Sequence, residues 1–477
     1  MGITTRGLSD IESNAKQERL KFIFLGIIFF FVIGGYTIAK ELKDSIFASI
    51  IGKEYIPLAK IIAMFALVPA IFVYSLMVDR VRRYQLLMIY SALFAIVGLL
   101  FAYYLGDPLI GLSNTHSSKH RIFGWLFYFF IEGYSPFVVS VFWAFANSIS
   151  SPDGARRNYP FMVAASKVGG LVGAGTAWYL LAQVGCDMSC GFGSPSDVWV
   201  HQIILAFSSV MLLLVPVAVH LLMRTVGGRF LHGYEAVYKA EKVKGQDGEE
   251  KTEKAGMLEG LVLLFRYPYV LGIFGMIYFY EVIATVLSYL RIGVAQADSH
   301  NIAAVSASLF KMVFFVHLAG FFMSIFGTST LMKRLGERTC LMLVPLLSGI
   351  LLLYLMIETT PAALIAAFIA LKTVNYAFAW PVRESLYIPT IKAIKFKSKS
   401  WIDAFGSKFA KAGGSTFNIF VSHLGPALSL PAHSFFFAGV VAMWFAVALL
   451  LGRRFDRAVA RNEVIGLDEP ETEGQPQ

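Results

Sequence analysis

The sequence predicts an all-α integral membrane protein. Hydrophobic residues make up 57% of the 477-residue chain and charged residues only 15%, which lies outside the composition of soluble globular domains. Apolar runs of the roughly 20 residues that a helix needs to cross a bilayer recur along the whole chain. These runs lack an alternation of polar and apolar residues, which excludes a transmembrane β-barrel and leaves α-helices.

Twelve apolar runs predict twelve transmembrane helices. They lie near residues 22–45, 57–78, 86–105, 122–148, 160–183, 201–223, 268–290, 303–330, 338–357, 361–380, 403–425 and 435–452. The domains that we expect are an N-terminal tail (1–21), a first six-helix half (22–223), a polar central loop (224–266), a second six-helix half (267–452) and a C-terminal tail (453–477). Two such halves are similar to those of major facilitator transporters, whose repeats enclose a central cavity.

Basic residues concentrate in alternate loops, beginning with the N-terminal tail. Because cytoplasmic loops of membrane proteins carry an excess of lysine and arginine, we expect both termini and the central loop to be cytoplasmic. This bias explains much of the formal net charge of +10, so we expect no nucleic-acid partner. The polar N-terminal tail includes acids, which argues against a cleavable signal or a transit peptide.

The sequence shows no zinc-ligand spacing, no Walker lysine and no nucleophile elbow, so we expect no cofactor, no metal and no hydrolysis. Cys186 and Cys190 share a predicted outer loop. A local disulfide and two free thiols are the alternatives there.

Several predicted spans contain charges, each of which costs at least ~2.5–3.5 kcal/mol to insert and therefore usually faces a cavity or a partner. The first span ends in "KELKD", which includes Lys40 and Lys43, and snorkelling lysines at a helix end are the alternative interpretation. Glu132 in the fourth span and Glu281 in the seventh lie among aromatic residues. For these acids the alternative is a pairing with lysine that serves assembly alone.

The tenth and eleventh spans add further charges. Lys408 and Lys411 lie one helical turn apart, where they repel unless an anion, an acid or water lies between them. The tenth span contributes Asn375, Trp380 and Arg383. By analogy of fold, spans 1, 4, 7 and 10 would line the central cavity. Charges of both signs with an excess of cations suit an anionic substrate.

Two weaker signals have structural interpretations. The run "SKVGGLVGAGTAW" (residues 166–178) resembles a nucleotide-binding glycine loop, but it lies within an apolar span, so we expect close packing of helices at its small residues. His317 in the eighth span is predicted to be a hydrogen-bonded core histidine rather than a proton relay.

The chain resembles the ATP/ADP translocase family of nucleotide transporters, found in plastids and in obligate intracellular bacteria. The stretches that carry the resemblance are "KELKDSIFASIIGKEYIPLAK", "SVFWAFANSISSPDGARRNYP" and "RESLYIPTIKAIKFKSKSWIDAFGSKFAKAGGS". The resemblance implies functional roles for the lysine of "LKDS" (Lys43), the glutamate before "FWAFAN" (Glu132), the span-7 glutamate (Glu281) and the lysine of "FAKAGG" (Lys411).

The tenth span departs from the family pattern. Asn375 stands where the family usually has a lysine, and Trp380 where it usually has an aspartate. The departure leaves the net charge unchanged but alters the cavity, and the family includes proton-coupled importers of other nucleotides. Trp380 could stack on a base or belong to the interfacial aromatic belt, and the sequence favours neither.

We therefore predict a transporter of the cell inner membrane, not an enzyme, that exchanges ATP for ADP by alternating access without hydrolysis. The alternatives are a proton-coupled symporter of other nucleotides and a carrier of a different anionic metabolite. We expect a monomer whose partners are the nucleotide, the lipid bilayer and, in the symport alternative, protons. The candidate substrate-binding residues are Lys40, Lys43, Glu132, Glu281, Asn375, Trp380, Arg383, Lys408 and Lys411.

Overall fold

The computed structural model describes residues 5–78, 80–150, 152–228, 231, 259–297, 299–326, 328–391, 394, 398–461 and 463–466. Most of the predicted central loop, residues 229–230 and 232–258, lies outside the described residues, as do residues 1–4 and 467–477 of the two tails.

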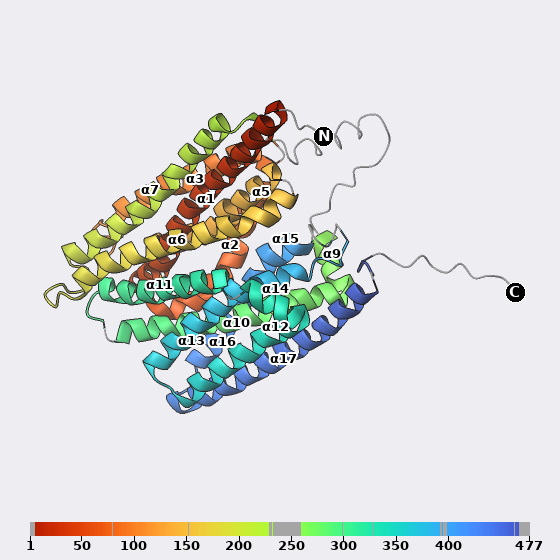
Figure 1. Cartoon of the computed structure of the whole chain (residues 1–477). Coiled ribbons are helices and arrows are strands. Elements are labelled where there is room, and N and C mark those ends of the chain that lie inside the picture. The colour runs from red at the N-terminus through yellow and green to blue at the C-terminus, as the bar shows by residue number, and fades with distance from the viewer. Residues whose placement is uncertain are drawn as a thin grey trace. The chain divides into compact units, whose positions relative to one another are not determined.

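Nearly all of the described chain is helical (Figure 1). The helices are α1 (Thr5–Phe47), η1 (Ala48–Gly52), η2 (Lys53–Tyr55), α2 (Ile56–Val78), α3 (Arg83–Tyr104), α4 (Ile122–Tyr134), η3 (Ser135–Val139), α5 (Ser140–Ile149), α6 (Pro152–Gly185), α7 (Pro195–Thr225), α9 (Glu259–Arg266), α10 (Pro268–Ala297), α11 (Ile302–Phe326), α12 (Thr328–Ile357), α13 (Pro361–Val374), η5 (Asn375–Ala379), α14 (Trp380–Ser385), α15 (Lys399–Trp401), η7 (Ile402–Gly406), α16 (Ser407–Ser422) and α17 (Pro426–Ala460). The predicted all-α class is confirmed.

Among the described residues, eight helical segments are long and apolar enough to cross a membrane. The count of twelve spans stays a prediction. Two of the remaining predicted spans form helices shorter than the roughly 20 residues of a full crossing, since α13 has 14 residues and α16 has 16. Both are continued by π-helical segments, η5 after α13 and η7 before α16, so the chain extends the helical path beyond the regular α-helix.

Apolar side chains on the outside of the helices follow the helical period. On α3, Leu93, Ile96 and Leu100 are 48%, 55% and 53% exposed. Residues three and four apart share one face of an α-helix, so these side chains form a stripe. An exposed apolar stripe of this kind suits contact with lipid tails.

The chain divides into two compact units, which are described here one at a time. Unit 1 comprises Met1–Lys251 and Tyr289–Phe321, and unit 2 comprises Thr252–Ser288 and Phe322–Gln477. Unit 1 therefore contains α1 to α7 together with the C-terminal end of α10 and most of α11. This division places Tyr289–Phe321 in unit 1, whereas the predicted second half runs from 267 to 452. The two six-helix halves stay a prediction.

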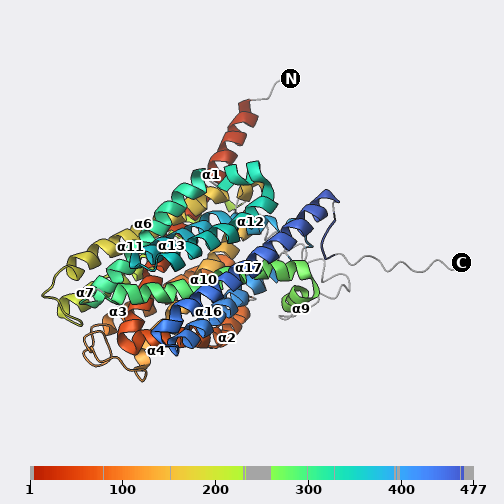
Figure 2. The ribbon, with the colours of Figure 1, turned by 90° about the horizontal axis from the view of Figure 1, so that it is seen from below.

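In unit 1, α1 packs along α6 and α7, and α3 packs along α7 (Figure 1). The N-terminal turns of α1 extend beyond the neighbouring helices (Figure 2). The glycine run of α6 explains how closely α6 approaches α1 and α11. A Cβ on Gly169 would overlap the carbonyl oxygen of Phe30 on α1, and one on Gly170 would overlap the ring of His317 on α11. The predicted helix packing at this run is confirmed.

Gly169→Ala is expected to destabilise the protein by about 1–3 kcal/mol, because overpacking forces neighbouring backbone to move. Thermal unfolding of the full chain in detergent measures the effect. Gly320→Ala on α11 is the matched control, since a Cβ there would meet no atom within 4 Å. A loss of stability that is equal in both variants would contradict the packing explanation.

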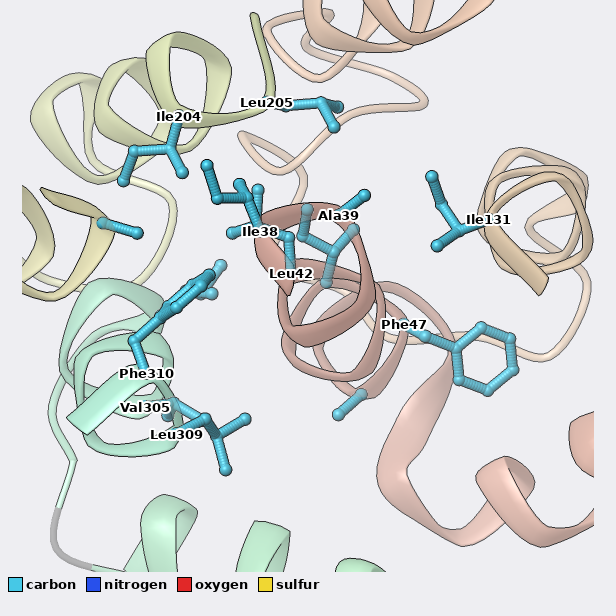
Figure 3. Close-up of a cluster of buried hydrophobic side chains, with 14 of the residues drawn as sticks. Ile38, Ala39, Leu42, Phe47, Ile131, Ile204, Leu205, Val305, Leu309 and Phe310 are labelled. Carbon is cyan, nitrogen blue, oxygen red and sulfur yellow. The ribbon is translucent and has the colours of Figure 1, made fainter. Parts of the chain in front are cut away.

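An apolar core surrounds α1 in unit 1 (Figure 3). Ile38 and Leu42 of α1 contribute to the same buried cluster as Ile131 of α4, Leu205 of α7 and Phe310 of α11. Each of these side chains is at most 4% exposed. This core fixes the rotation of α1 about its axis and so determines which way its charged residues can point.

In unit 2, α12 packs along α17, which Figures 1 and 2 show as long neighbouring helices. A second close approach involves α10 and α16. A Cβ on Gly414 of α16 would lie 2.7 Å from the carbonyl oxygen of Val282 on α10. The glycine therefore lets α16, which carries Lys408 and Lys411, lie directly against the helix that carries Glu281.

Candidate functional site

The predicted charges of spans 1 and 4 meet in the interior of unit 1. Lys43 Nζ on α1 lies 2.5 Å from Glu132 Oε1 on α4 and 3.3 Å from Asp44 Oδ1. The side chains of Lys43 and Glu132 are only 4% and 15% exposed. A charge-assisted hydrogen bond this short, between largely buried side chains, is among the stronger polar interactions that a protein makes.

The ammonium group of Lys43 also contacts an aromatic ring. Its Nζ lies 4.2 Å from the ring centroid of Tyr128, which is one turn before Glu132 on α4. Phe47 packs against the same ring, with 4.8 Å between the centroids. The ring quadrupole attracts the cation, and the aromatic surroundings exclude water from the ion pair.

A second buried ion pair lies beside the first. Arg291, near the C-terminal end of α10, donates from Nη2 to Glu41 Oε2 at 2.6 Å, and the same nitrogen is 4.0 Å from Asp44 Oδ2. Both Arg291 and Glu41 are 2% exposed. Arg291 is not among the predicted site residues, because it falls one residue beyond the predicted span 268–290. An arginine so close to a predicted span end was the available signal.

We call Lys43, Glu41, Asp44, Glu132 and Arg291 the unit 1 charge cluster. It contains three carboxylates and two cations. Further positive charge lies nearby, since Lys60 of α2 acts electrostatically on Asp44 and Lys40 directly precedes Glu41 on α1. The Nζ of Lys40 lies 5.8 Å from the ring centroid of Tyr36. The cluster thus holds cations that are neutralised by carboxylates of the protein itself.

The candidate residues of span 10 lie in unit 2. Asn375, the first residue of η5, is 4% exposed. Lys372, one turn earlier, lies 5.5 Å from the ring of Tyr280 and 5.8 Å from that of Tyr376. The tenth span therefore presents an amide, an ammonium group and two aromatic rings close together.

Trp380 is 47% exposed, and the guanidinium of Arg383 lies 5.6 Å from its ring. One face of the indole is therefore already in contact with a cation. The choice between base stacking and the interfacial belt stays open for this residue.

The remaining candidates of unit 2 lie on α10 and α16. Glu281, Lys408 and Lys411 are each partly buried. Gly413 and Gly414 of α16 pack against α10, with a Cβ on Gly413 lying 2.9 Å from Tyr278 Oη. The structure thus brings Lys43 and Glu132 together in unit 1 and places Glu281, Lys411, Lys408, Arg383, Asn375 and Trp380 in unit 2. The substrate-binding role of all these residues stays a prediction.

π-helical turns accompany the candidate residues. Four such segments are named in the described chain, and each lies within four residues of a predicted site residue or of the charge cluster. η1 begins four residues after Asp44, η3 three residues after Glu132, and η5 at Asn375, while η7 ends two residues before Lys408. Single π turns within α-helices occur frequently at functional sites.

His317 and the two cysteines of the predicted outer loop lie outside the charge cluster. His317 Nε2 lies 3.3 Å from Thr37 Oγ1, so the predicted hydrogen-bonded core histidine is confirmed. Cys186 and Cys190 are free thiols in this structure. Among the described residues, no group of three or more histidine, cysteine, aspartate or glutamate side chains could hold a metal ion.

Comparison with solved structures shows the fold. The crystal structure of a D-xylose-proton symporter superposes with a TM-score of 0.61 and 14% sequence identity, covering 96% of this chain and 99% of that chain. A nucleoside transporter, NupG, superposes with a TM-score of 0.50 and 11% identity over 93% of this chain. With its apolar helices and buried charges, the molecule is a multi-pass membrane protein with the fold of the major facilitator transporters.

Comparison of sequences shows the family. The profile of the TLC ATP/ADP transporter family matches residues 13–377. An ADP,ATP carrier protein of Chlamydia muridarum is 23% identical over 94% of this chain and 90% of its own length. A chloroplastic ADP,ATP carrier protein of Arabidopsis thaliana is 22% identical over 93% of this chain and 76% of its own length. The chain belongs to the TLC ATP/ADP transporter family.

Proposed function

We propose that this chain exchanges ATP for ADP across the membrane by alternating access, without hydrolysis. The observation that carries the proposal is the buried pair of Lys43 with Glu132, in a chain of the ATP/ADP transporter family. Its carrier relatives support a nucleotide substrate and argue against an enzyme. Exchange needs no hydrolysis, because the concentration gradients of the two nucleotides drive it.

The charge cluster supports a phosphate contact at Lys43 on physical grounds. Removing one partner of a buried ion pair typically costs about 3–5 kcal/mol, because the other charge is left unpaired. Lys43 is paired with Glu132 in this structure, and a nucleotide phosphate offers the same kind of acceptor oxygen. A phosphate can therefore replace the glutamate without leaving the lysine unpaired.

A nucleotide carries several negative charges, so one lysine does not suffice. We propose Lys40 as a neighbouring phosphate contact in unit 1. Within unit 2, we propose Lys408, Lys411 and Arg383 as phosphate contacts. Glu281 is proposed as the counter-charge for these cations in the empty carrier. Asn375 and Trp380, which replace charged residues of the family pattern, would then contact the uncharged part of the nucleotide.

The distribution of basic residues supports an orientation in the cell inner membrane with both termini in the cytoplasm. In that orientation α1 ends at the outer side, since it starts from the N-terminal tail. The C-terminal end of α10 lies at the same side, because α10 starts after the central loop. The charge cluster then belongs to the outer part of the molecule.

Uptake of labelled ATP into intact cells that express the chain tests the proposal. We expect internal ADP to accelerate uptake and a protonophore to leave it unchanged, with unlabelled ATP and ADP both competing. Recovered label should still be ATP. Cells carrying the empty vector are the control. Uptake that collapses with the protonophore and ignores internal ADP would indicate proton symport instead, and absence of competition by nucleotides would indicate another anion.

A further inference from the structure

Buried polar groups join the C-terminal end of α10 to α1 and the start of α11 to α7. Residues Tyr289–Phe321 follow the central loop in sequence, yet they form one compact unit with α1 to α7. Part of this packing is apolar, through residues such as Ile292 and Phe310. The polar contacts include an ion pair at the end of α10 and a buried carboxylate at the start of α11.

The first of these contacts is the ion pair of Arg291 with Glu41. The Nη2–Oε2 distance is 2.6 Å, and both residues are 2% exposed. Asp44 links this pair to Lys43, since Asp44 Oδ1 is 3.3 Å from Lys43 Nζ and its Oδ2 is 4.0 Å from Arg291 Nη2. Asp44 therefore lies between the two cations, with one carboxylate oxygen facing each.

The second contact closes the N-terminal end of α11. The carboxylate of Asp197 on α7 accepts hydrogen bonds from the backbone N–H groups of Ile302, at 3.2 Å, and Ala303, at 2.7 Å. Asp197 is fully buried. A carboxylate at this position satisfies N–H groups that the helix itself leaves unpaired and complements the helix dipole.

A short chain of hydrogen bonds runs from the helix of the second contact, α7, to α1. His201, one turn after Asp197, lies 2.9 Å through its Nε2 from Ser306 Oγ of α11. Ser306 Oγ lies 2.8 Å from Ser45 Oγ of α1. Ser45 directly follows Asp44 in sequence, so the hydrogen bonds that run from α7 across α11 end on α1 at the residue next to the charge cluster.

We propose that Arg291 is the latch of a gate: its ion pair with Glu41 holds the end of α10 against α1 in this conformation and opens in each transport cycle. The inference rests on the alternating access proposed above and adds a residue that neither the sequence pattern nor the family resemblance singled out. When a phosphate takes Lys43, Asp44 loses that partner and turns to Arg291, which weakens the hold of Glu41 on the arginine.

Two features favour a latch over a static brace. A buried ion pair adds little stability compared with apolar residues of the same volume, so stability alone does not explain its presence. The pair also shares Asp44 with Lys43, which gives an anion bound at Lys43 a direct influence on it.

Thiol accessibility tests the latch. Ala295, four residues after Arg291 on the same face of α10, is 4% exposed, and Ala295→Cys in a background without Cys186, Cys190 and Cys340 supplies the reporter. A polar maleimide is added to the full-length protein in detergent, where it reaches both sides. In Glu41→Gln we expect the labelling rate to rise at least about tenfold over the reporter alone, because the closed state loses its ion pair.

Two further variants separate a latch from a brace. The double variant Glu41→Gln with Arg291→Met leaves no unpaired charge, so folding is preserved, and we expect labelling as fast as in Glu41→Gln. Arg291→Lys keeps the charge and should label slowly. Arg454→Gln, which breaks an exposed ion pair with Glu463, is the matched control and should also label slowly.

Slow labelling of the neutral double variant would overturn the latch, because packing alone would then hold the end of α10 in place. Fast labelling of Arg291→Lys would overturn it as well. These readouts do not depend on transport. If the unmodified chain shows no ATP/ADP exchange, the proposed function is refuted. The labelling rates would still decide whether Arg291 acts as a latch.

Discussion

Lys43→Ala is expected to abolish ATP/ADP exchange and to destabilise the protein by about 3–5 kcal/mol. The two effects share one cause. Lys43 is the near partner of both Glu132 and Asp44, so its removal takes the nearest cation away from two carboxylates whose side chains are only 15% and 7% exposed. The same removal deletes the proposed phosphate contact. Uptake of labelled ATP and thermal unfolding in detergent measure the two effects separately.

A double variant tells the two effects apart. Lys43→Met with Glu132→Gln removes the cation together with its nearest carboxylate and leaves Asp44 within reach of Arg291. We expect most of the lost stability to return, because replacing both partners of a buried pair is often nearly neutral. Transport should remain absent. Normal exchange by this double variant would show that Lys43 does not bind phosphate.

Lys411→Ala is expected to reduce the apparent affinity for ATP about 10- to 100-fold while insertion into the membrane stays intact, since a hydrogen bond to a charged group contributes about 1.5–3 kcal/mol. Lys411 is partly buried on α16, and Gly414 holds that helix against α10. The concentration dependence of ATP uptake measures the loss. Lys411→Arg should retain part of the affinity, because the positive charge stays on the same helix.

The control for Lys411 is Arg454→Ala, which removes a basic residue from the same unit. Arg454 pairs with Glu463 at the exposed end of α17, so its removal should leave transport within about twofold of the unmodified chain. An equal loss in both variants would indicate a general effect of net charge. Unchanged affinity in Lys411→Ala would remove this residue from the proposed phosphate contacts.

Membrane physics explains why part of the candidate site could be predicted from the sequence. Lys43 and Glu132 stand out in apolar spans because a charge there needs a partner, and the structure places them 2.5 Å apart. Arg291 could not be recognised in this way, because it does not lie inside a predicted apolar span. The sequence places it just past a predicted span end, where a basic residue is ordinary, and only the packing of α10 beside α1 shows that it is buried.

The backbone departures from α-helix could not have been predicted. The segments around Asn375 and after Glu132 consist mostly of apolar and aromatic residues, with Gly133, Pro136 and Pro381 as the helix-disturbing residues nearby. A π turn depends on backbone hydrogen bonding, which residue composition does not reveal. The division into units likewise depends on which faces of α10 and α11 find partners, and hydropathy alone carries no information about that.

Each π turn has a mechanical consequence for the helix that contains it. An α-helix advances its side chains by about 100° per residue, and one extra residue in a turn offsets every later side chain by about that angle. Trp380 and Arg383 follow η5, and Lys408 and Lys411 follow η7, so the direction in which these side chains point depends on a single inserted residue. A small slip of backbone hydrogen bonds at either segment would swing them around the helix axis without unwinding it.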